Sequence, residues 1–446
     1  MFDFKNRQKK LPIFTIVLIS CYFVIAVIFF AYGMSEGPGR VYTQPEPSPT
    51  PTATIGPFTP PPPSTPDPNA DTQRVPMPPA VQAKGIFYNI WYPERPVANS
   101  LAMCIELIES TDLNAIVIDV KEDGGRVTFR SDSELIPESS QLTDTQHNNI
   151  YGPTDYASLA EAVADLNSRG IYTIARVVCF KDNIYPRNSP TSGILTTAGE
   201  VWRDNNDSRW LNPHNKDNWE FIAEICREAA RIGFKEVQLD YVRFPLEGRL
   251  GVINYGPAAE EATRYQVISE FVAYIRDEMA KLGVRTSADI FGISAISDRD
   301  AGVIGQNVQR LLPSLDFISP MIYPSHFANS SNGVMGNGVG QTINGRLYTH
   351  PDTVPYDVMY NTLQHFRQHI DRFNEENPNT ETAVIRPFLQ YFTASYLRDG
   401  YWIPYGPAEV RAQIEAVYDA GFNEWLLWSN TNTYSAEIFT VAPHTP

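Results

Sequence analysis

From Ala83 onward, short runs in which apolar and polar residues alternate are each followed by a longer stretch with the period of a helix. The strand-like runs lie at 85–91, 115–121, 171–180, 236–245, 285–291, 317–323, 385–392 and 424–428. The helical stretches lie at 97–110, 156–168, 218–232, 260–282, 306–312, 356–374 and 408–420, with a further fragment near residue 435. Such repeated units predict a parallel sheet covered by helices.

Glycines mark the ends of several predicted helices, where a left-handed C-cap is favoured. They are Gly170, Gly233, Gly283 and Gly421. Eight strand-then-helix units are typical of an α/β protein of the (β/α)8 TIM barrel type. A doubly wound open sheet is the alternative. We disfavour it because no glycine-rich phosphate loop follows the first strand, and the Gly124-Gly125 pair after the second lacks the dinucleotide-binding pattern.

The run at 236–245 differs from an ordinary core strand. Val237, Leu239 and Tyr241 fall on one face, whereas Gln238 and Asp240 fall on the other. An acid near the carboxyl end of such a strand indicates a functional site. The alternative is that Asp240 caps the next turn or pairs with the arginine three residues later.

The N-terminal segment predicts a membrane anchor. Residues 1–10 are basic, and the stretch from Leu11 to Tyr32 has no charged residue, which is enough for a hydrocarbon core that takes about 20 residues. We therefore expect a cytoplasmic tail (1–10), a transmembrane helix (11–32) and an extracytoplasmic remainder. The alternatives are a cleaved signal peptide and a lipoprotein signal at Cys21. The apolar run continues past Cys21 to Phe30, which favours an uncleaved anchor.

Residues 33–82 are dominated by proline, threonine and serine. Such a segment buries too little apolar surface to fold and favours extended conformations. It predicts a disordered linker that holds the globular domain, residues 83–446, away from the membrane.

Charge and cysteine content exclude several classes of function. The net charge of −16 leaves no basic stripe to neutralise phosphates, so we expect no nucleic-acid partner. The four cysteines are Cys21, Cys104, Cys179 and Cys226. Their wide spacing argues against a zinc site or a disulfide framework, and we expect the last three to be buried. His365 and His369 are four residues apart on a predicted helix, and we expect them to face solvent rather than bind a metal. No cofactor is expected.

In a barrel of this type the site lies at the carboxyl ends of the strands. Acids stand near three of these ends: Asp119 on the second strand, Asp240 on the fourth and Asp289 on the fifth. The neighbouring residues that we expect to bind substrate are Lys121, Arg176, Tyr241, Arg243, Tyr323, Gln390, Trp428 and Asn430. Acids, cations, amides and aromatic rings together are typical of a polar ligand site.

Each of these residues also has a structural interpretation. Asp119 could hold Lys121 or cap a loop, and Asp289 could pair with Arg176. Trp428 could belong to the core. Two long connections, 181–215 and 325–355, are expected to shape specificity. The tryptophans that are candidates for stacking on sugar rings are Trp91, Trp202, Trp210, Trp402 and Trp428.

Glycoside hydrolysis requires two carboxyl groups and neither a metal nor a cofactor. Adjacent strands lie about 4.8 Å apart, so Asp240 and Asp289 fit the carboxyl separation of roughly 5–5.5 Å in a retaining pair. We assign Asp240 as the nucleophile and Asp289 as the general acid/base. Asp119, two strands from Asp240, is the third candidate and would suit a wider, inverting separation or a role in substrate binding.

Several phrases of the sequence carry a family resemblance. They are Gly85-Ile86-Phe87-Tyr88, the run 115–124, the run 174–182, Trp210-Leu211-Asn212-Pro213 and, most specifically, the run 239–245. Together they resemble a bacterial family of "putative glycosyl hydrolase" domains over about residues 83–428. The resemblance implies a TIM barrel related to sugar-cleaving enzymes, whose fourth strand usually carries a catalytic acid. Related enzymes often carry the acid/base on a strand later than the fifth, but the sixth strand here ends without a carboxylate.

The sequence therefore predicts a membrane-anchored extracytoplasmic glycoside hydrolase, of the retaining type, that acts on a polysaccharide. The alternative from another functional class is a non-catalytic barrel that binds glycan at the cell envelope, which the missing acid on the sixth strand favours. A metal-dependent amidohydrolase-type barrel is disfavoured because no His-x-His sequence ends the first strand.

Overall fold

The computed structural model describes residues 77–91, 101–151, 154–327 and 340–439. The predicted tail, the predicted anchor at 11–32 and most of the predicted linker lie outside these ranges. Among the described helices, none is both long and apolar enough to cross a membrane.

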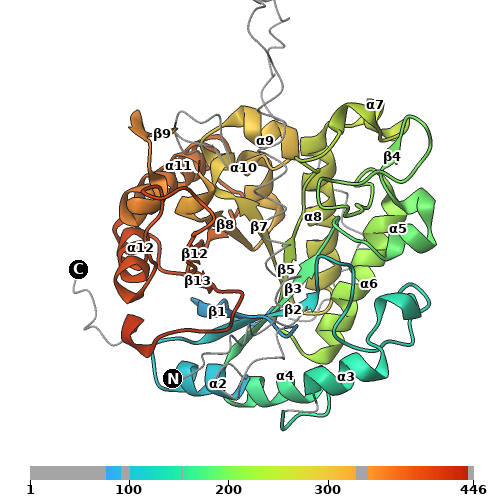
Figure 1. Cartoon of the computed structure of the whole chain (residues 1–446), viewed down its shortest axis with the longest axis horizontal. Coiled ribbons are helices and arrows are strands. Elements are labelled where there is room, and N and C mark those ends of the chain that lie inside the picture. Colours follow the sequence, from blue (N-terminus) through green and yellow to red (C-terminus); the bar gives the residue numbers. More distant parts are fainter. Residues whose placement is uncertain (1–76, 92–100, 152–153, 328–339, 440–446) are drawn as a thin grey trace, which may run out of the picture. The chain divides into compact units, whose positions relative to one another are not determined.

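Eight parallel strands close into a ring in the described part of the chain (Figure 1). In order around the ring they are β1 (Lys84–Tyr88), β2 (Ala115–Lys121), β3 (Tyr172–Val178), β5 (Glu236–Asp240), β7 (Arg285–Phe291), β8 (Phe317–Ile322), β12 (Phe388–Gln390) and β13 (Trp425–Trp428). Because β7 pairs with β8 and β13 pairs with β1, no edge is left open. The predicted eight-stranded barrel is confirmed.

The predicted seventh strand, 385–392, is divided in the structure. A short segment, β11 (Val384–Ile385), pairs with β8, and β12 begins at Phe388. Pro387 stands between them, and it has no N–H group to donate to a sheet ladder. Its carbonyl still accepts a 2.9 Å hydrogen bond from the backbone of Leu426 on β13, so the two segments together occupy one position in the ring.

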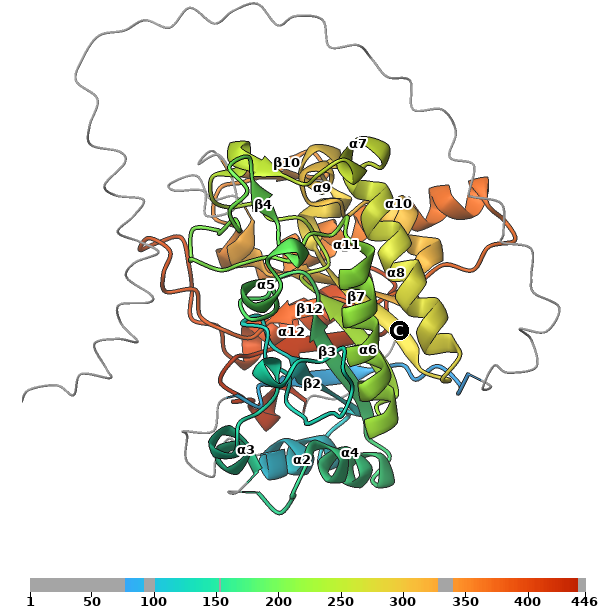
Figure 2. The same ribbon diagram turned by 90° about the vertical axis from the view of Figure 1, so that its right-hand side faces the viewer.

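Helices surround the ring, with α6 and α8 on the outer side of β3, β5 and β7 (Figure 2). The helices with a predicted counterpart are α2 (Leu101–Glu109), α4 (Leu159–Ser168), α6 (Lys216–Ile232), α8 (Arg264–Ala280), α10 (Val308–Leu311), α11 (Pro355–Glu376) and α12 (Pro407–Asp419). The helices without one are α3 (Asp144–Tyr151), α5 (Tyr185–Asn188), α7 (Ala258–Glu261) and α9 (Asp298–Ile304). A single 3₁₀ turn at Ala436–Ile438 replaces the predicted C-terminal fragment.

The helix ends follow local chemistry. Gly233, after α6, has the left-handed backbone (φ 111°) that the sequence predicts for a C-cap. The predicted helix at 260–282 begins four residues late, because Thr263 and Gln266 form a capping box that starts α8. The helix α3 is polar and lacks an apolar stripe, so periodicity does not reveal it.

Two short antiparallel ladders lie in the connections at the carboxyl ends of the strands. In the connection from β3 to α6, β4 (Leu195–Thr196) pairs with β6 (Ile253–Asn254), which follows β5. In the connection from β8 to α11, β9 (Gln341–Ile343) pairs with β10 (Arg346–Tyr348). The two predicted long loops are therefore partly structured in the described residues.

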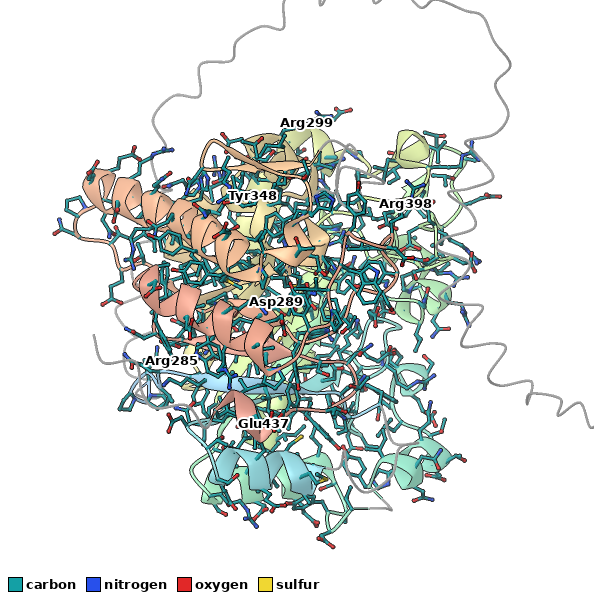
Figure 3. All side chains as sticks on the ribbon, turned by 60° about the vertical axis from the view of Figure 1, so that its left-hand side comes forward. Arg285, Asp289, Arg299, Tyr348, Arg398 and Glu437 are labelled. Atoms are coloured by element: carbon teal, nitrogen blue, oxygen red, sulfur yellow. The ribbon has the colours of Figure 1, made fainter. Side chains whose placement is uncertain are left out.

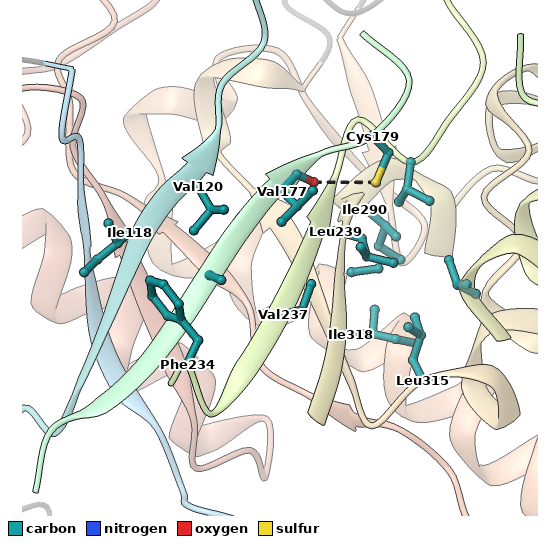
Figure 4. Packing of buried hydrophobic residues seen from close by; sticks show 14 of the residues in the cluster. Ile118, Val120, Val177, Cys179, Phe234, Val237, Leu239, Ile290, Leu315 and Ile318 are labelled. Atoms are coloured by element: carbon teal, nitrogen blue, oxygen red, sulfur yellow. Dashed lines mark hydrogen bonds between the residues drawn. The ribbon is translucent and has the colours of Figure 1, made fainter. Parts of the chain in front are cut away.

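The barrel has two separate apolar layers. Inside the ring, side chains such as Phe87, Val117, Phe388 and Leu426 form one cluster. Outside it, alternate residues of the same strands pack under the helices, as Figure 4 shows for Val177, Leu239 and Ile290 among others. Alternation along each strand sends neighbouring side chains to opposite layers. The three described cysteines are unpaired and buried, as predicted.

The amino-terminal end of the barrel interior is closed by charged residues. Glu236, at the start of β5, accepts hydrogen bonds from Tyr172 Oη (3.1 Å), Ser287 Oγ (2.5 Å) and the guanidinium of Arg386. Nη1 of Arg386 lies 3.9 Å from Oε2 of Glu424. Glu236 and Arg386 are both fully buried, so each offsets part of the cost of burying the other's charge.

We expect Arg386→Met to destabilise the fold by about 3–5 kcal/mol, because it leaves the Glu236 carboxylate buried without its cation. Urea unfolding followed by tryptophan fluorescence measures this change. Adding Glu236→Gln to that variant should restore part of the loss, since no buried charge then remains. As a control, Arg346→Met removes the exposed pair with Asp357 and should cost no more than about 1 kcal/mol. Equal losses in the two single variants would contradict this account.

Candidate functional site

Three predicted residues meet inside the barrel near its carboxyl end. The guanidinium of Arg176, on β3, donates from Nη1 to Asp119 Oδ1 on β2 (2.5 Å). It also donates from Nε (2.9 Å) and Nη2 (2.5 Å) to Asp240 Oδ2 on β5. All three residues are at most 5% exposed. Asp119 therefore pairs with Arg176 and not with Lys121, and Asp240 pairs with Arg176 and not with Arg243.

Asp289 completes this group from β7, and its surroundings are different. Leu239 is in register with Ala288, so Asp240 and Asp289 follow as neighbours on adjacent strands. Asp289 is 1% exposed, and neither of its carboxylate oxygens has a hydrogen-bond partner among the described residues. The structural alternative in which Asp289 pairs with Arg176 is therefore wrong. Figure 3 shows Asp289 in the middle of the barrel domain, while Arg285 lies at the other end of the same strand.

Burial and neighbouring charges shift the pKa values of these groups to different extents. It raises the pKa of Asp289 well above 3.8, and the neighbouring charge of Asp240 raises it further. Burial also raises the pKa of Asp119, to about 6, although Arg176 opposes the shift. Burial alone would lower the pKa of Arg176, but Asp119 and Asp240 outweigh it and the net shift is upward. The shifts favour the charged form of Arg176 and the protonated form of Asp289.

Aromatic residues border the acids. Trp428, at the end of β13, stacks on Phe87 of β1 with ring centroids 4.0 Å apart, and its ring lies 5.2 Å from the guanidinium of Arg176. Tyr323 follows β8, and its hydroxyl has no partner among the described residues. Burial raises the pKa of Tyr323, and the nearby carboxyl groups of Asp289 and Asp240 raise it further. The hydroxyl of Tyr323 and the carboxyl of Asp289 are thus both buried without a hydrogen-bond partner among the described residues.

Tyr241 has a strained backbone next to the acid group. Its φ of 48° lies in the left-handed region, which is costly for an aromatic residue. Its N–H donates to Asp240 Oδ1 at 2.6 Å. Its ring centroid lies 4.9 Å from Nζ of Lys181, which in turn bonds to Asp123 Oδ2 at 2.9 Å. This conformation orients the Asp240 carboxyl and directs an aromatic ring to the end of β5.

Three predicted substrate-binding residues do not join this group. Lys121 is fully buried and lies 2.9 Å from Asp182, because the register between β2 and β3 shifts between Asp119 and Lys121. The side chain of Gln390 is buried and bonds to Ser325 and Asp352, so it supports the connections around it. Asn430 is exposed in the loop after β13.

The other candidates are placed as follows. Arg243 is half-buried, with its guanidinium among three aromatic rings. Trp202 and Trp210 are each 2% exposed, so neither offers an open stacking face. His369 does not face solvent: it is half-buried, and its ring contacts Gln309 and the carbonyl of Ala295.

Sequence reasoning missed two contributors. Phe87 supports Trp428, and the alternation of β1, which places Phe87 inward, was the signal for it. The Lys181–Asp123 pair joins connections that follow two different strands, and periodicity gives no signal for it. In the described ranges, no three His, Cys, Asp or Glu side chains are grouped so that they could hold a metal ion.

A family model described as "Putative glycosyl hydrolase domain" matches residues 88–434. No curated protein matches the chain in sequence. A hypothetical protein from Ruminiclostridium thermocellum is 29% identical, with a TM-score of 0.39, over 46% of this chain and 96% of that one. The PgaB (BpsB) glycoside hydrolase domain from Bordetella bronchiseptica is 13% identical, with a TM-score of 0.48, over 78% of this chain and 94% of that one. An Ostrinia furnacalis group II chitinase domain is 12% identical, with a TM-score of 0.44, over 81% and 95%.

The protonation of Asp289 predicts a change in stability with pH. The folded chain holds this proton above the ordinary pKa of 3.8, whereas the unfolded chain releases it. Folding stability contributed by this group therefore falls as pH rises from about 4 toward the folded pKa, with a slope of at most about 1.4 kcal/mol per pH unit. We expect Asp289→Asn to remove this slope and to be more stable than the parent at pH 7.

The measurement is the free energy of urea unfolding of both proteins at a series of pH values. Asp119 adds a similar slope up to its pKa of about 6, but it is present in both proteins and cancels in the difference. Parallel curves for the parent and Asp289→Asn would show that Asp289 is ionised in the folded chain.

Proposed function

The chain belongs to the putative glycosyl hydrolase domain family, and from this premise we propose that it hydrolyses the glycosidic bonds of a polysaccharide by carboxyl chemistry. The observation that carries the proposal is a buried carboxyl without hydrogen-bond partners, Asp289, beside a carboxylate held by an arginine, Asp240. Hydrolysis of a glycosidic bond needs one protonated and one ionised carboxyl, and the two environments provide this difference.

In the first step, Asp289 gives its proton to the glycosidic oxygen as the bond to the anomeric carbon breaks. Asp240 supplies the electron pair that forms a bond to that carbon, and a glycosyl ester results. In the second step, Asp289, now ionised, takes a proton from water while the water oxygen displaces Asp240. Both carboxyl groups return to their starting states, and the configuration at the anomeric carbon is retained.

Arg176 and Asp119 act on this chemistry through Asp240. The guanidinium donates two charge-assisted hydrogen bonds to Asp240 Oδ2 and so fixes the position of this carboxyl group. It also stabilises the negative charge that returns to Asp240 when the ester is cleaved. Asp119 shares the guanidinium and fixes its orientation from the opposite side. Trp428 and Tyr323 border the acids, where they would contact a sugar ring.

A comparison of leaving groups tests the role of Asp289. We expect Asp289→Asn to lower kcat/KM, which reports the first step, about 10²–10⁴-fold on oligosaccharides, because it removes the general acid. The loss in kcat/KM should be much smaller on a nitrophenyl glycoside, whose leaving group does not need the proton. Asp240→Asn should lower kcat on both substrates, because both require the nucleophile. Asp399→Asn, an exposed acid, is the matched control and should leave kcat unchanged. Equal losses on both substrates in Asp289→Asn would contradict its assignment as the acid.

A glycan-binding barrel without turnover is the second candidate. The acids are almost fully buried, and two of them share Arg176 in an ion pair that by itself could serve only structure. In that case the parent and Asp240→Asn would bind the same oligosaccharides with equal affinity, and neither would release product. Product released by the parent alone favours the enzyme.

The location of the domain is proposed from the sequence alone. The uncharged stretch from Leu11 to Tyr32 and the proline-rich residues 33–82 support a barrel tethered outside the cytoplasmic membrane. We expect the barrel to be digested when protease is added to intact cells from which any outer layers have been removed. Protection of the barrel until the cells are lysed would contradict this location.

A further inference from the structure

Arg243 lies next to the acid group, three residues after Asp240. Its guanidinium carbon is 4.9 Å from the ring centroid of Trp210, 5.2 Å from that of Tyr241 and 5.0 Å from that of Phe291. Tyr241 and Phe291 come from the carboxyl ends of β5 and β7, the strands that carry Asp240 and Asp289. The guanidinium is therefore held at the same end of the barrel as the two acids.

The hydrogen-bonding capacity of Arg243 is mostly unused. Its guanidinium has five N–H donors, and the bond found for it is from Nη1 to the carbonyl of Phe244 (3.0 Å). Within the described ranges, no carboxylate oxygen lies within 4.0 Å of its nitrogens. Asp240, Glu247 and Asp204 act on it only at longer range. The oxygens of Asp240 and Asp204 already accept other bonds.

Among the described residues, the two arginines that are buried more deeply than Arg243 are paired with carboxylates, whereas Arg264, half-buried like Arg243, bonds to a backbone carbonyl. Arg176 bonds to Asp119 and Asp240, and Arg386 bonds to Glu236. A half-buried cation without an anion is costly, and stacking on aromatic rings offsets this only in part. Burial accordingly lowers the pKa of Arg243. In a chain of net charge −16, an arginine kept free of carboxylates at this position indicates that its anion comes from outside the chain.

We infer that the polysaccharide substrate is acidic, and that Arg243 binds a carboxylate or phosphate group on one of its sugar units. This inference rests on the proposed function for the meaning of the site. The forked donors of a guanidinium match the oxygens of either anion, and stacking keeps the fork planar and oriented. Arg243 then determines specificity, because a neutral sugar would leave its donors without a partner.

The experiment measures the binding of three oligosaccharides of equal length to the full chain by calorimetry: one neutral, one containing a uronic acid and one carrying a phosphate. Every protein also carries Asp289→Asn, so that binding is recorded without turnover. We expect at least one acidic oligosaccharide to bind better than the neutral one. Arg243→Gln should weaken its binding roughly 10- to 100-fold and change neutral binding less than about twofold. The preferred acidic ligand identifies the anion.

Arg299→Gln is the control, because it removes the same charge from an exposed position on α9 (Figure 3). Arg243→Lys, which keeps a cation among the rings but not the fork, replaces Arg243→Gln if that variant does not fold, and should still bind the acidic ligand more weakly than the parent. The inference is overturned if acidic ligands bind no better than the neutral one, including no binding of either. Equal effects of Arg243→Gln and Arg299→Gln also overturn it. If the protein hydrolyses only neutral glycans, the proposed function stands and this inference fails. If an acidic ligand binds through Arg243 but no glycan is hydrolysed, this inference stands and the proposed hydrolase activity fails.

Discussion

One guanidinium shared by two carboxylates determines the properties of the site. Arg176 bonds to Asp119 on one side and Asp240 on the other, in a part of the barrel that is almost closed to solvent. The single positive charge of Arg176 cannot balance the negative charges of Asp119 and Asp240 together with a third one on Asp289. Burial raises the pKa of Asp289, and the charge of Asp240 raises it further, because ionisation of Asp289 would add that third charge without a hydrogen-bond donor to stabilise it. The division of roles between Asp240 and Asp289 follows from this limit.

Each end of the barrel interior contains a buried acidic residue, but the two residues differ in their hydrogen bonding. At the amino-terminal end, Glu236 receives three hydrogen bonds, including one from Arg386. At the carboxyl end, Asp289 and the hydroxyl of Tyr323 receive none among the described residues. In the first arrangement the Glu236 carboxylate is satisfied by donors of the chain, although Nε and Nη1 of Arg386 have no hydrogen-bond partner among the described residues. The second leaves polar groups buried and unpaired, which costs stability and is typical of groups that act on a ligand.

Much of the fold follows from the sequence, because strand and helix periods alternate from Ala83 onward and glycines such as Gly233 end the helices. The prediction that acids on three strands gather at one end follows from the same topology. It could not show which cation they share, since the separation of Arg176 from Asp119 along the chain gives no sign of contact. The register shift that turns Lys121 toward Asp182 was also hidden, because alternation assigns Lys121 to the same face as Asp119.

The most direct measurement of this account is the infrared difference spectrum between the parent chain and Asp289→Asn at neutral pH. If Arg176 keeps Asp240 ionised and Asp289 remains an acid, the parent shows one additional band of a protonated carboxyl group that is absent from the variant. An additional carboxylate band in its place would show that Asp289 is ionised. The assignment of acid and nucleophile would then be wrong.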